Sequence, residues 1–159
     1  MSASRLVLER LPARHGELWV GHEAARALLA AGYQLPGLMK FVAHGEGLLA
    51  RLSARQFLLL GVAPVAAPPA VVRLGHACVE FTLAGADVRA LLAEVASASL
   101  EECAPDTWFC TRICGLDAVL CQAGQAWRVV CAPAEAPWLG VALAERVRAR
   151  GGEAPGSHH

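Results

Sequence analysis

The stretch at 71–95 constrains the fold of this chain more than any other. It reads VVRLGHACVEFTLAGADVRALLAEV and alternates apolar and polar residues as a β-strand does, up to a break at Gly85. Its apolar residues then recur at helical spacing. We expect two short strands separated by Gly75 and His76, followed by a helix after Gly85. A strand that leads directly into a helix indicates a fold of mixed α and β structure.

The same two periodicities predict the other elements. Strands are expected where β-favouring residues lie between turn residues, and helices where alanine and leucine recur every three or four positions. The expected strands are 5–11, 17–20, 39–44, 48–52, 57–60, 71–74, 77–83, 107–114, 118–122 and 126–131. The expected helices are 22–31, with Gly32 as its stop signal, 87–95 and 135–150.

The order of these elements repeats along the chain. Each half reads strand, strand, helix and three strands, and a last helix follows the second half. ARALLA at 25–30 and VRALLA at 88–93 occupy the same place in the two halves, and the strands that follow align Phe57 with Trp127. We therefore predict an α+β fold with two pseudo-repeated halves (β-β-α-β-β-β), mainly antiparallel sheets with helices packed on them, and a C-terminal helix.

Proline content suggests where the halves meet. The segment GVAPVAAPPA at 61–70 carries three prolines, which remove backbone donors and favour an extended path. We predict an N-terminal half at 1–61, a proline-rich linker at 62–70 and a C-terminal half at 71–150. The tail at 151–159 contains GSHH, which resembles a tag remnant, and we expect it to be disordered.

Charge and hydropathy narrow the class of partner. The chain has 14 basic and 14 acidic residues with no run of either sign, which does not suit nucleic acid. Its charged fraction is only 18%, and either an alanine-rich composition or a surface covered by a partner accounts for this. Charges near the N-terminus leave no run for a signal peptide, and prolines interrupt the longest uncharged stretch, 56–72. We expect a cytoplasmic protein that binds no membrane.

Six cysteines are the first candidates for chemistry: Cys78, Cys103, Cys110, Cys114, Cys121 and Cys131. They form no C-x2-C pair, and most fall within expected strands, so one interpretation is buried, reduced thiols. The other is a soft-metal or iron–sulfur site that uses Cys103, Cys110, Cys114 and Cys121, because alternation places Cys110 and Cys114 on one strand face. Both interpretations stay open at this point.

The other reactive residue types form no catalytic pattern. The histidines before the tail are His15, His22, His44 and His76, of which His76 is at a predicted bend. The carboxylates that neither periodicity brings together are Glu80, Asp87, Glu94, Glu101, Glu102 and Asp106. Nucleophile elbows, phosphate-binding loops and dinucleotide-binding glycine patterns are absent from the sequence. We therefore assign no catalytic, cofactor-binding or metal-binding residue.

Four tryptophans accompany a single tyrosine, and they are Trp19, Trp108, Trp127 and Trp138. Large aromatic side chains serve as core anchors or as hot spots of protein interfaces. We expect Trp108 or Trp138 to lie at a contact with a partner.

The stretch at 71–95, with the segment APDTWFCTRICGLDAVLCQAGQAWRVVCAPAEAPWLGVALAERV after it, resembles the gamma subunit of heterotetrameric sarcosine oxidase. In that family a Leu-Ser-His run enters a strand, a turn opens a helix, and hydrophobic hairpins precede a tryptophan-bearing C-terminal helix. The segment GEGLLARLSARQFLLLG of the first half is also similar to a family segment. The resemblance covers 35–150, but Gly75 replaces the family's serine and the cysteines are extra. These departures leave the substrate open.

The resemblance implies a fold related to the folate-binding domains of the glycine-cleavage aminomethyltransferase. It also implies alpha, beta and delta subunits as partners. FAD, FMN, NAD, tetrahydrofolate and zinc would belong to those partners, and this chain would carry no cofactor. The chain would then be a non-catalytic gamma-type subunit that stabilises a multi-subunit, flavin-dependent amine oxidase or dehydrogenase.

Two alternatives belong to other functional classes. The chain could be a diverged folate-dependent one-carbon transfer protein, which the implied fold relation suggests. It could also be a cysteine-based metal or iron–sulfur protein. Under the leading interpretation the chain belongs to an oxidoreductase complex without an active site of its own.

Overall fold

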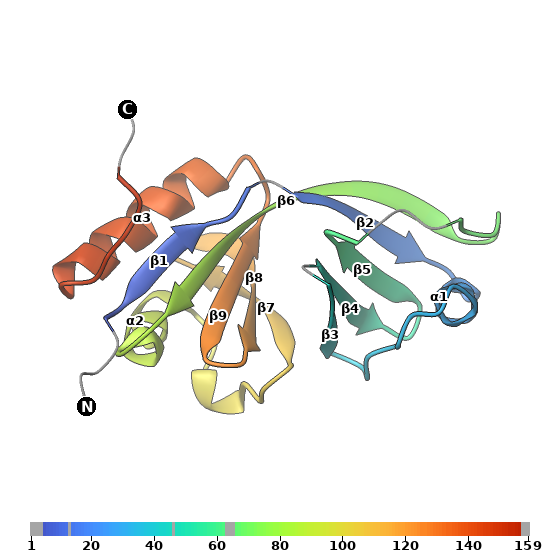
Figure 1. Cartoon of the computed structure of the whole chain (residues 1–159), viewed down its shortest axis with the longest axis horizontal. Coiled ribbons are helices and arrows are strands. Elements are labelled where there is room, and N and C mark those ends of the chain that lie inside the picture. Colours follow the sequence, from blue (N-terminus) through green and yellow to red (C-terminus); the bar gives the residue numbers. More distant parts are fainter. Residues whose placement is uncertain (1–4, 13, 46, 63–65, 157–159) are drawn as a thin grey trace. The chain divides into compact units, whose positions relative to one another are not determined.

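The computed structural model describes residues 5–12, 14–45, 47–62 and 66–156 (Figure 1). Contacts divide the chain into two compact units. Unit 1 is drawn from Met1–Ala13, Val79–Pro105 and Phe109–His159, and unit 2 from Arg14–Cys78 and Asp106–Trp108. The strands are mainly antiparallel and the last element is a long helix, so the predicted α+β class is confirmed.

Unit 2 is a sheet with one helix packed on it. Its strands are β2 (Arg14–Val20), β3 (Phe41–His44), β4 (Gly47–Ser53), β5 (Gln56–Leu60) and the first part of β6 (Val72–Ala84). They run in the antiparallel order β3-β4-β5-β2-β6. Helix α1 (Ala24–Ala30) buries Leu28 in a core with Trp19, Phe57 and Leu59.

Unit 1 is a sheet that carries two helices. Its strands are β1 (Val7–Arg10), the end of β6, β7 (Trp108–Ile113), β8 (Leu116–Ala123) and β9 (Ala126–Cys131), in the order β1-β6-β9-β8-β7. Helices α2 (Val88–Val95) and α3 (Ala136–Ala149) flank β1 in Figure 1. Leu91 of α2 and Leu143 of α3 share one core with Phe81 and Val129 of the sheet. A short 3-10 helix, η1 (Leu100–Glu102), follows α2.

One strand order recurs in both units, which confirms the predicted pseudo-repeat. The order β3-β4-β5-β2-β6 of unit 2 corresponds to β7-β8-β9-β6-β1 of unit 1. Helix α1 follows β2 as α2 follows β6, so the two RALLA segments occupy equivalent places. Phe57 and Trp127 are the second residues of β5 and β9, and both are buried. The guanidinium carbon of Arg51 lies 5.5 Å from the Phe57 ring centroid, and that of Arg89 lies 5.6 Å from the Trp127 ring centroid.

A single long strand replaces the two short strands predicted around Gly75 and His76. Strand β6 runs without a break, and its Gly75 pairs with Glu17 and its His76 with Gly16 of β2. The prediction was wrong because glycine usually weakens a strand, whereas here β2 pairs with β6 along this whole stretch. The strand supplies its first part to unit 2 and its last part to unit 1.

Glycine ends α1 as the sequence predicts. Gly32 has a φ of +86° and donates its N–H to the carbonyl of Leu29 at 3.0 Å, while Tyr33 donates to Leu28 at 3.0 Å. This pair of hydrogen bonds is the Schellman motif, which needs a left-handed residue at this position. Gly151 ends α3 in the same way, with a φ of +70°.

Parts of the predicted linker and tail lie outside the described residues, namely 63–65 and 157–159. Within the tail, Glu153 forms a parallel bridge with Val7 of β1. The Glu153 N–H also donates to the carbonyl of Leu6 at 2.8 Å. The described beginning of the tail is therefore hydrogen-bonded to unit 1.

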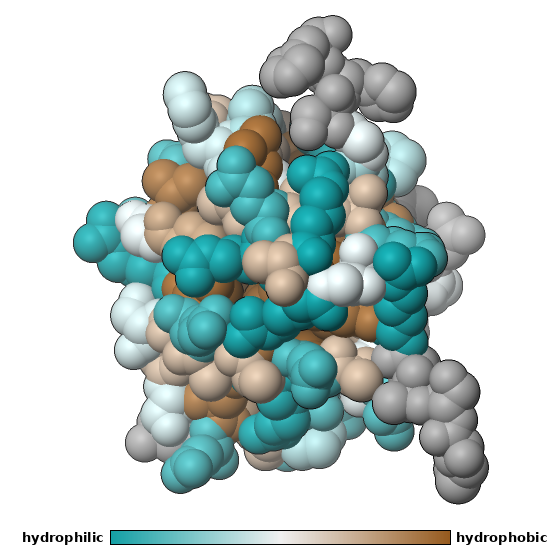
Figure 2. Space-filling view, turned by 90° about the vertical axis from the view of Figure 1, so that its left-hand side faces the viewer, coloured by the Kyte–Doolittle hydropathy of each residue, from teal (hydrophilic) through white to brown (hydrophobic). Residues whose placement is uncertain are grey.

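The surface on the side of unit 1 seen in Figure 2 is largely polar, with apolar residues in small patches between hydrophilic ones. Within the described part of the chain, the large apolar side chains exposed to solvent are Leu29, Leu38, Met39, Val72, Trp138 and Val141. None of the helices in the described ranges is long and apolar enough to cross a bilayer.

Candidate functional site

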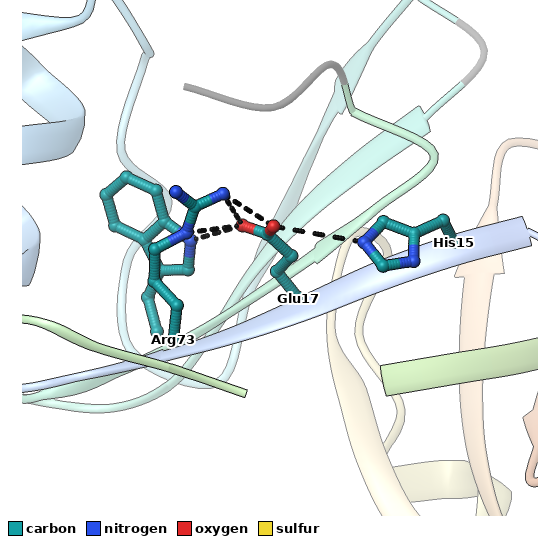
Figure 3. A network of polar contacts seen from close by, with 4 residues as sticks. His15, Glu17 and Arg73 are labelled. Atoms are coloured by element: carbon teal, nitrogen blue, oxygen red, sulfur yellow. Dashed lines mark hydrogen bonds and ion pairs between the residues drawn. The ribbon is translucent and has the colours of Figure 1, made fainter. Parts of the chain in front are cut away.

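A network of polar contacts centres on Glu17 of β2 (Figure 3). Arg73 of β6 donates from Nη2 to both carboxylate oxygens, at 2.5 and 2.7 Å, and from Nε to Oε2 at 3.0 Å. The indole N–H of Trp19 donates to Oε2 at 2.9 Å, and Nε2 of His15 lies 3.8 Å from Oε1. These groups meet because Glu17 and Trp19 are two residues apart on one strand face and Arg73 pairs with Trp19 across the sheet.

The electrostatics of this network favour an ion pair. The hydrogen bond from Arg73 lowers the pKa of Glu17 below its usual value, and this effect exceeds the opposing effect of burial. The guanidinium carbon of Arg73 also lies 5.5 Å from the Trp19 ring centroid, within cation–π range. Because Glu17 is held ionised by its donors, it suits a role in joining β2 to β6 and does not suit proton donation at neutral pH.

Glu80 of β6 is a buried carboxylate in unit 1, with 1% of its surface exposed. Nε of Arg128 on β9 lies 3.3 Å from its Oε1. Neither carboxylate oxygen of Glu80 accepts a hydrogen bond from the described residues. A buried charge without a partner costs several kcal/mol, so Arg128 is the group that compensates this burial. The sequence pattern offers no sign of the pair, because its members are distant in the chain and meet only through the register of β6 and β9.

The six cysteines differ widely in burial. Cys110 is exposed and Cys114 is half-buried, and the buried ones are Cys78, Cys103, Cys121 and Cys131. Burial raises the pKa of the Cys121 thiol to about 12. Cys110 lies in β7, whereas Cys114 lies in the following turn with a φ of +51°. In the part of the chain that the structure describes, no three His, Cys, Asp or Glu side chains form a group that could hold a metal ion.

The histidines lie on different elements. His15, His22 and His44 are exposed, and the His44 ring packs on Tyr33 with 4.8 Å between ring centroids. His76 is paired through its backbone in β6, and its side chain lies outside the described part.

Most carboxylates singled out in the sequence are also separate. Asp87, Glu101 and Asp106 are exposed, and the Glu102 side chain lies outside the described part. Glu94 of α2 forms ion pairs with two arginines of unit 1, Arg146 at 3.7 Å and Arg150 at 3.1 Å.

The tryptophans divide into buried and exposed members. Trp19, Trp108 and Trp127 are buried, and the Trp108 indole N–H donates to the carbonyl of Arg51 at 3.3 Å. Trp138 of α3 is 74% exposed. Of the two tryptophans expected at a partner contact, Trp138 is therefore the one that faces solvent.

A groove of about 380 Å³ opens beside α3 in unit 1, and we call it the α3 groove. Its lining includes Arg10 of β1, Phe81 of β6 and Gly140 and Val141 of α3. A Cβ at Gly140 would lie 3.2 Å from the Phe81 ring, so glycine allows the helix to approach the sheet closely here. The guanidinium carbon of Arg10 lies 6.0 Å from the Phe81 ring centroid. Periodicity alone does not predict this groove, because β1 and α3 are at opposite ends of the chain.

Solved structures share this fold. A chain of the heterotetrameric sarcosine oxidase from Corynebacterium sp. U-96, in complex with pyrrole 2-carboxylate, superposes with a TM-score of 0.78 at 15% identity. The match covers 94% of this chain and 87% of that one. The two chains have the same fold. No protein family and no curated protein matches the sequence.

Aminomethyltransferase T of the glycine cleavage system from Bartonella henselae is a second structural neighbour. It superposes with a TM-score of 0.67 at 16% identity, covering 96% of this chain. This chain spans about half of that protein, 48% of its length. The fold relation to sarcosine oxidase and to the aminomethyltransferase is therefore confirmed, while membership of the gamma-subunit family stays a prediction.

Proposed function

We propose that this chain is a non-catalytic, gamma-type subunit of a multi-subunit, flavin-dependent amine oxidase or dehydrogenase of the sarcosine oxidase kind, and that it stabilises the complex. The observation that carries the proposal is the likeness of fold to a chain of a heterotetrameric sarcosine oxidase over nearly the full length of both chains.

The described side chains support the same role. The carboxylate of Glu17 forms an ion pair with Arg73, and that of Glu80 forms one with Arg128. Each pair therefore joins two neighbouring strands of its own sheet. The exposed indole of Trp138 is a side chain of the type that anchors protein interfaces. Such an arrangement suits a chain that acts through contact with larger subunits.

The proposal extends to the rest of the complex. Its alpha-, beta- and delta-type subunits would carry FAD, FMN, NAD, tetrahydrofolate and zinc, and this chain would carry no cofactor. The complex would oxidise sarcosine or another N-methylated or secondary amine in the cytoplasm.

Co-expression with large, flavin-binding amine oxidase subunits from the same genome tests the proposal. We expect the chain to elute with them in gel filtration, in a peak that absorbs as flavin does. Omitting the chain should lower the yield and the melting temperature of the complex and leave the flavin content of each remaining large subunit unchanged. A chain that elutes alone as a monomer in their presence contradicts the proposal.

A folate-dependent one-carbon transfer protein is the second candidate function. Its support is the likeness of fold to aminomethyltransferase T, although this chain spans about half of that protein. Titration calorimetry of the isolated chain with tetrahydrofolate separates the two candidates. Saturable binding favours the transfer protein, and no heat of binding removes it.

A further inference from the structure

The α3 groove and the helix beside it present apolar surface to solvent. Trp138 is 74% exposed and Val141 is 53% exposed, and their spacing of three residues places them one turn apart on α3. Val141 also lines the groove, so the apolar side chains of the helix continue into it. Large exposed aromatic side chains beside a groove are typical of protein contact sites.

Arg10 provides the charge of this surface. It is exposed, lines the groove, and forms no ion pair with a carboxylate in the described part of the chain. A second charge, Glu135, lies just before α3. Burial raises the pKa of the Cys131 thiol, Glu135 raises it further and Arg10 lowers it, so both charges lie near Cys131. Among the described residues that line the groove there is no carboxylate. The surface is therefore complementary to an apolar segment that carries a negative charge.

One feature favours a different protein over a second copy of this chain as the occupant. A symmetrical dimer presents the same surface to itself, and among the described residues this groove has a cation but no lining carboxylate to meet it. A segment of another chain can supply both the apolar side chain and the acid.

We propose that the α3 groove docks a segment of a larger partner subunit, which inserts an apolar side chain beside Phe81 and places an aspartate or glutamate on Arg10. Trp138 packs against the same segment at the edge of the groove. This inference rests on the proposed function, since it identifies the surface through which the accessory subunit joins its complex.

Affinity measurements with a purified large, flavin-binding amine oxidase subunit from the same genome test the inference. Trp138→Ala should weaken binding by about 30-fold or more, the loss expected of a hot-spot residue. Arg10→Glu should weaken it by more than about tenfold, while Arg10→Lys should retain most of the affinity and its salt dependence. The matched control is Leu29→Ala on α1, which removes a side chain that is 58% exposed in unit 2 and should change affinity less than about twofold. Circular dichroism and thermal melting verify that each variant is folded.

The outcomes separate this inference from the proposed function. If the wild type binds and Trp138→Ala and Arg10→Glu bind equally well, the inference is overturned and the proposed function stands. If the wild type does not bind the large subunit, both are overturned. Self-association of the wild type that Trp138→Ala abolishes would assign the surface to a second copy, which also overturns the inference.

Discussion

At the scale of single residues, the pair Glu17 and Arg73 makes stability depend on pH. Because Arg73 lowers the pKa of Glu17 below 4.5, the ionised carboxylate is favoured in the folded state. Its contribution is fully present above about pH 4.5 and is lost as the pH falls through the folded pKa. We expect Glu17→Gln to lower the free energy of unfolding at neutral pH by about 1 to 3 kcal/mol.

Urea unfolding across the acid range measures this effect. The difference between wild type and Glu17→Gln should shrink as the pH falls below about 4.5. Glu145→Gln replaces an exposed glutamate of α3 and serves as the control, with a stability close to wild type at each pH. A Glu17→Gln difference that stays constant down to about pH 2 would show that the charge of Glu17 is not its cause.

Arg128 compensates the buried charge of Glu80, and its removal should be costly. Arg128→Met leaves the carboxylate buried beside an apolar side chain, and we expect a loss of about 3 to 5 kcal/mol in the free energy of unfolding. The double variant Glu80→Leu with Arg128→Met removes both charges and should recover most of that loss. Chemical denaturation of the three proteins forms the test, and a double variant less stable than Arg128→Met would be inconsistent with it.

Thiol reactivity should follow the burial of the cysteines. Burial raises the pKa of Cys121 to about 12, so its reactive thiolate is scarce at neutral pH. Partial burial of the thiol, and secondly Asp117, raise the pKa of Cys110. The residue is nevertheless exposed, so a reagent can reach it. Labelling with an aromatic disulfide reagent at about pH 8, followed by mass spectrometry, should therefore modify Cys110 first and Cys121 only after unfolding. Labelling of Cys121 as fast as Cys110 in the folded protein would contradict this order.

At the scale of elements, the turn between β6 and α2 depends on Gly85. Its φ is +102°, and a Cβ there would lie 2.1 Å from the carbonyl oxygen of Arg5. Gly85→Ala should lower the free energy of unfolding by about 3 kcal/mol or more, because backbone strain and a backbone clash add. Gly124→Ala is the matched control, with a φ of +60° and open space around its Cβ, and should cost about 1 kcal/mol. Thermal melting that ranks the two variants equally would argue against the clash with Arg5.

Local periodicity accounts for the elements that were predicted correctly, but it does not predict that β6 is one unbroken strand. Helices α2 and α3 bury one apolar stripe each, and Gly32 and Gly151 stop helices through their left-handed conformation, so both signals are local. Strand β6 was divided in the prediction because Gly75 weakens a strand locally, while its pairing with a distant strand decides the outcome. Of the residues at and beside the α3 groove, only Trp138 was predicted from the sequence as a contact residue. Arg10 lines the groove because the fold brings β1 beside α3.

At the scale of the whole molecule, the repeated strand order was visible in the sequence but the strand partners were not. The two copies of the motif share element order and the RALLA string, which a linear comparison detects. Strand β1 pairs with the end of β6, with Val7 opposite Ala84, although the strands β2 to β5 and helix α1 lie between them in the sequence. Such long-range pairing depends on register and on burial of Leu6 and Leu8, which no local pattern specifies.

Because the first 13 residues join unit 1, this unit should not be stable without them. Removing them deletes β1 and the buried Leu6 and Leu8, and each buried leucine contributes about 2 to 5 kcal/mol, against a total stability of about 5 to 15 kcal/mol. We expect the tryptophan emission of the fragment 14–159 to shift to longer wavelength, because Trp127 becomes exposed to water. Adding a synthetic peptide of residues 1–13 should reverse this shift. A peptide carrying Leu6→Ala and Leu8→Ala keeps the backbone donors and acceptors of β1 and should fail to restore the signal. Native fluorescence of the fragment without any peptide would mean that β1 is dispensable to unit 1.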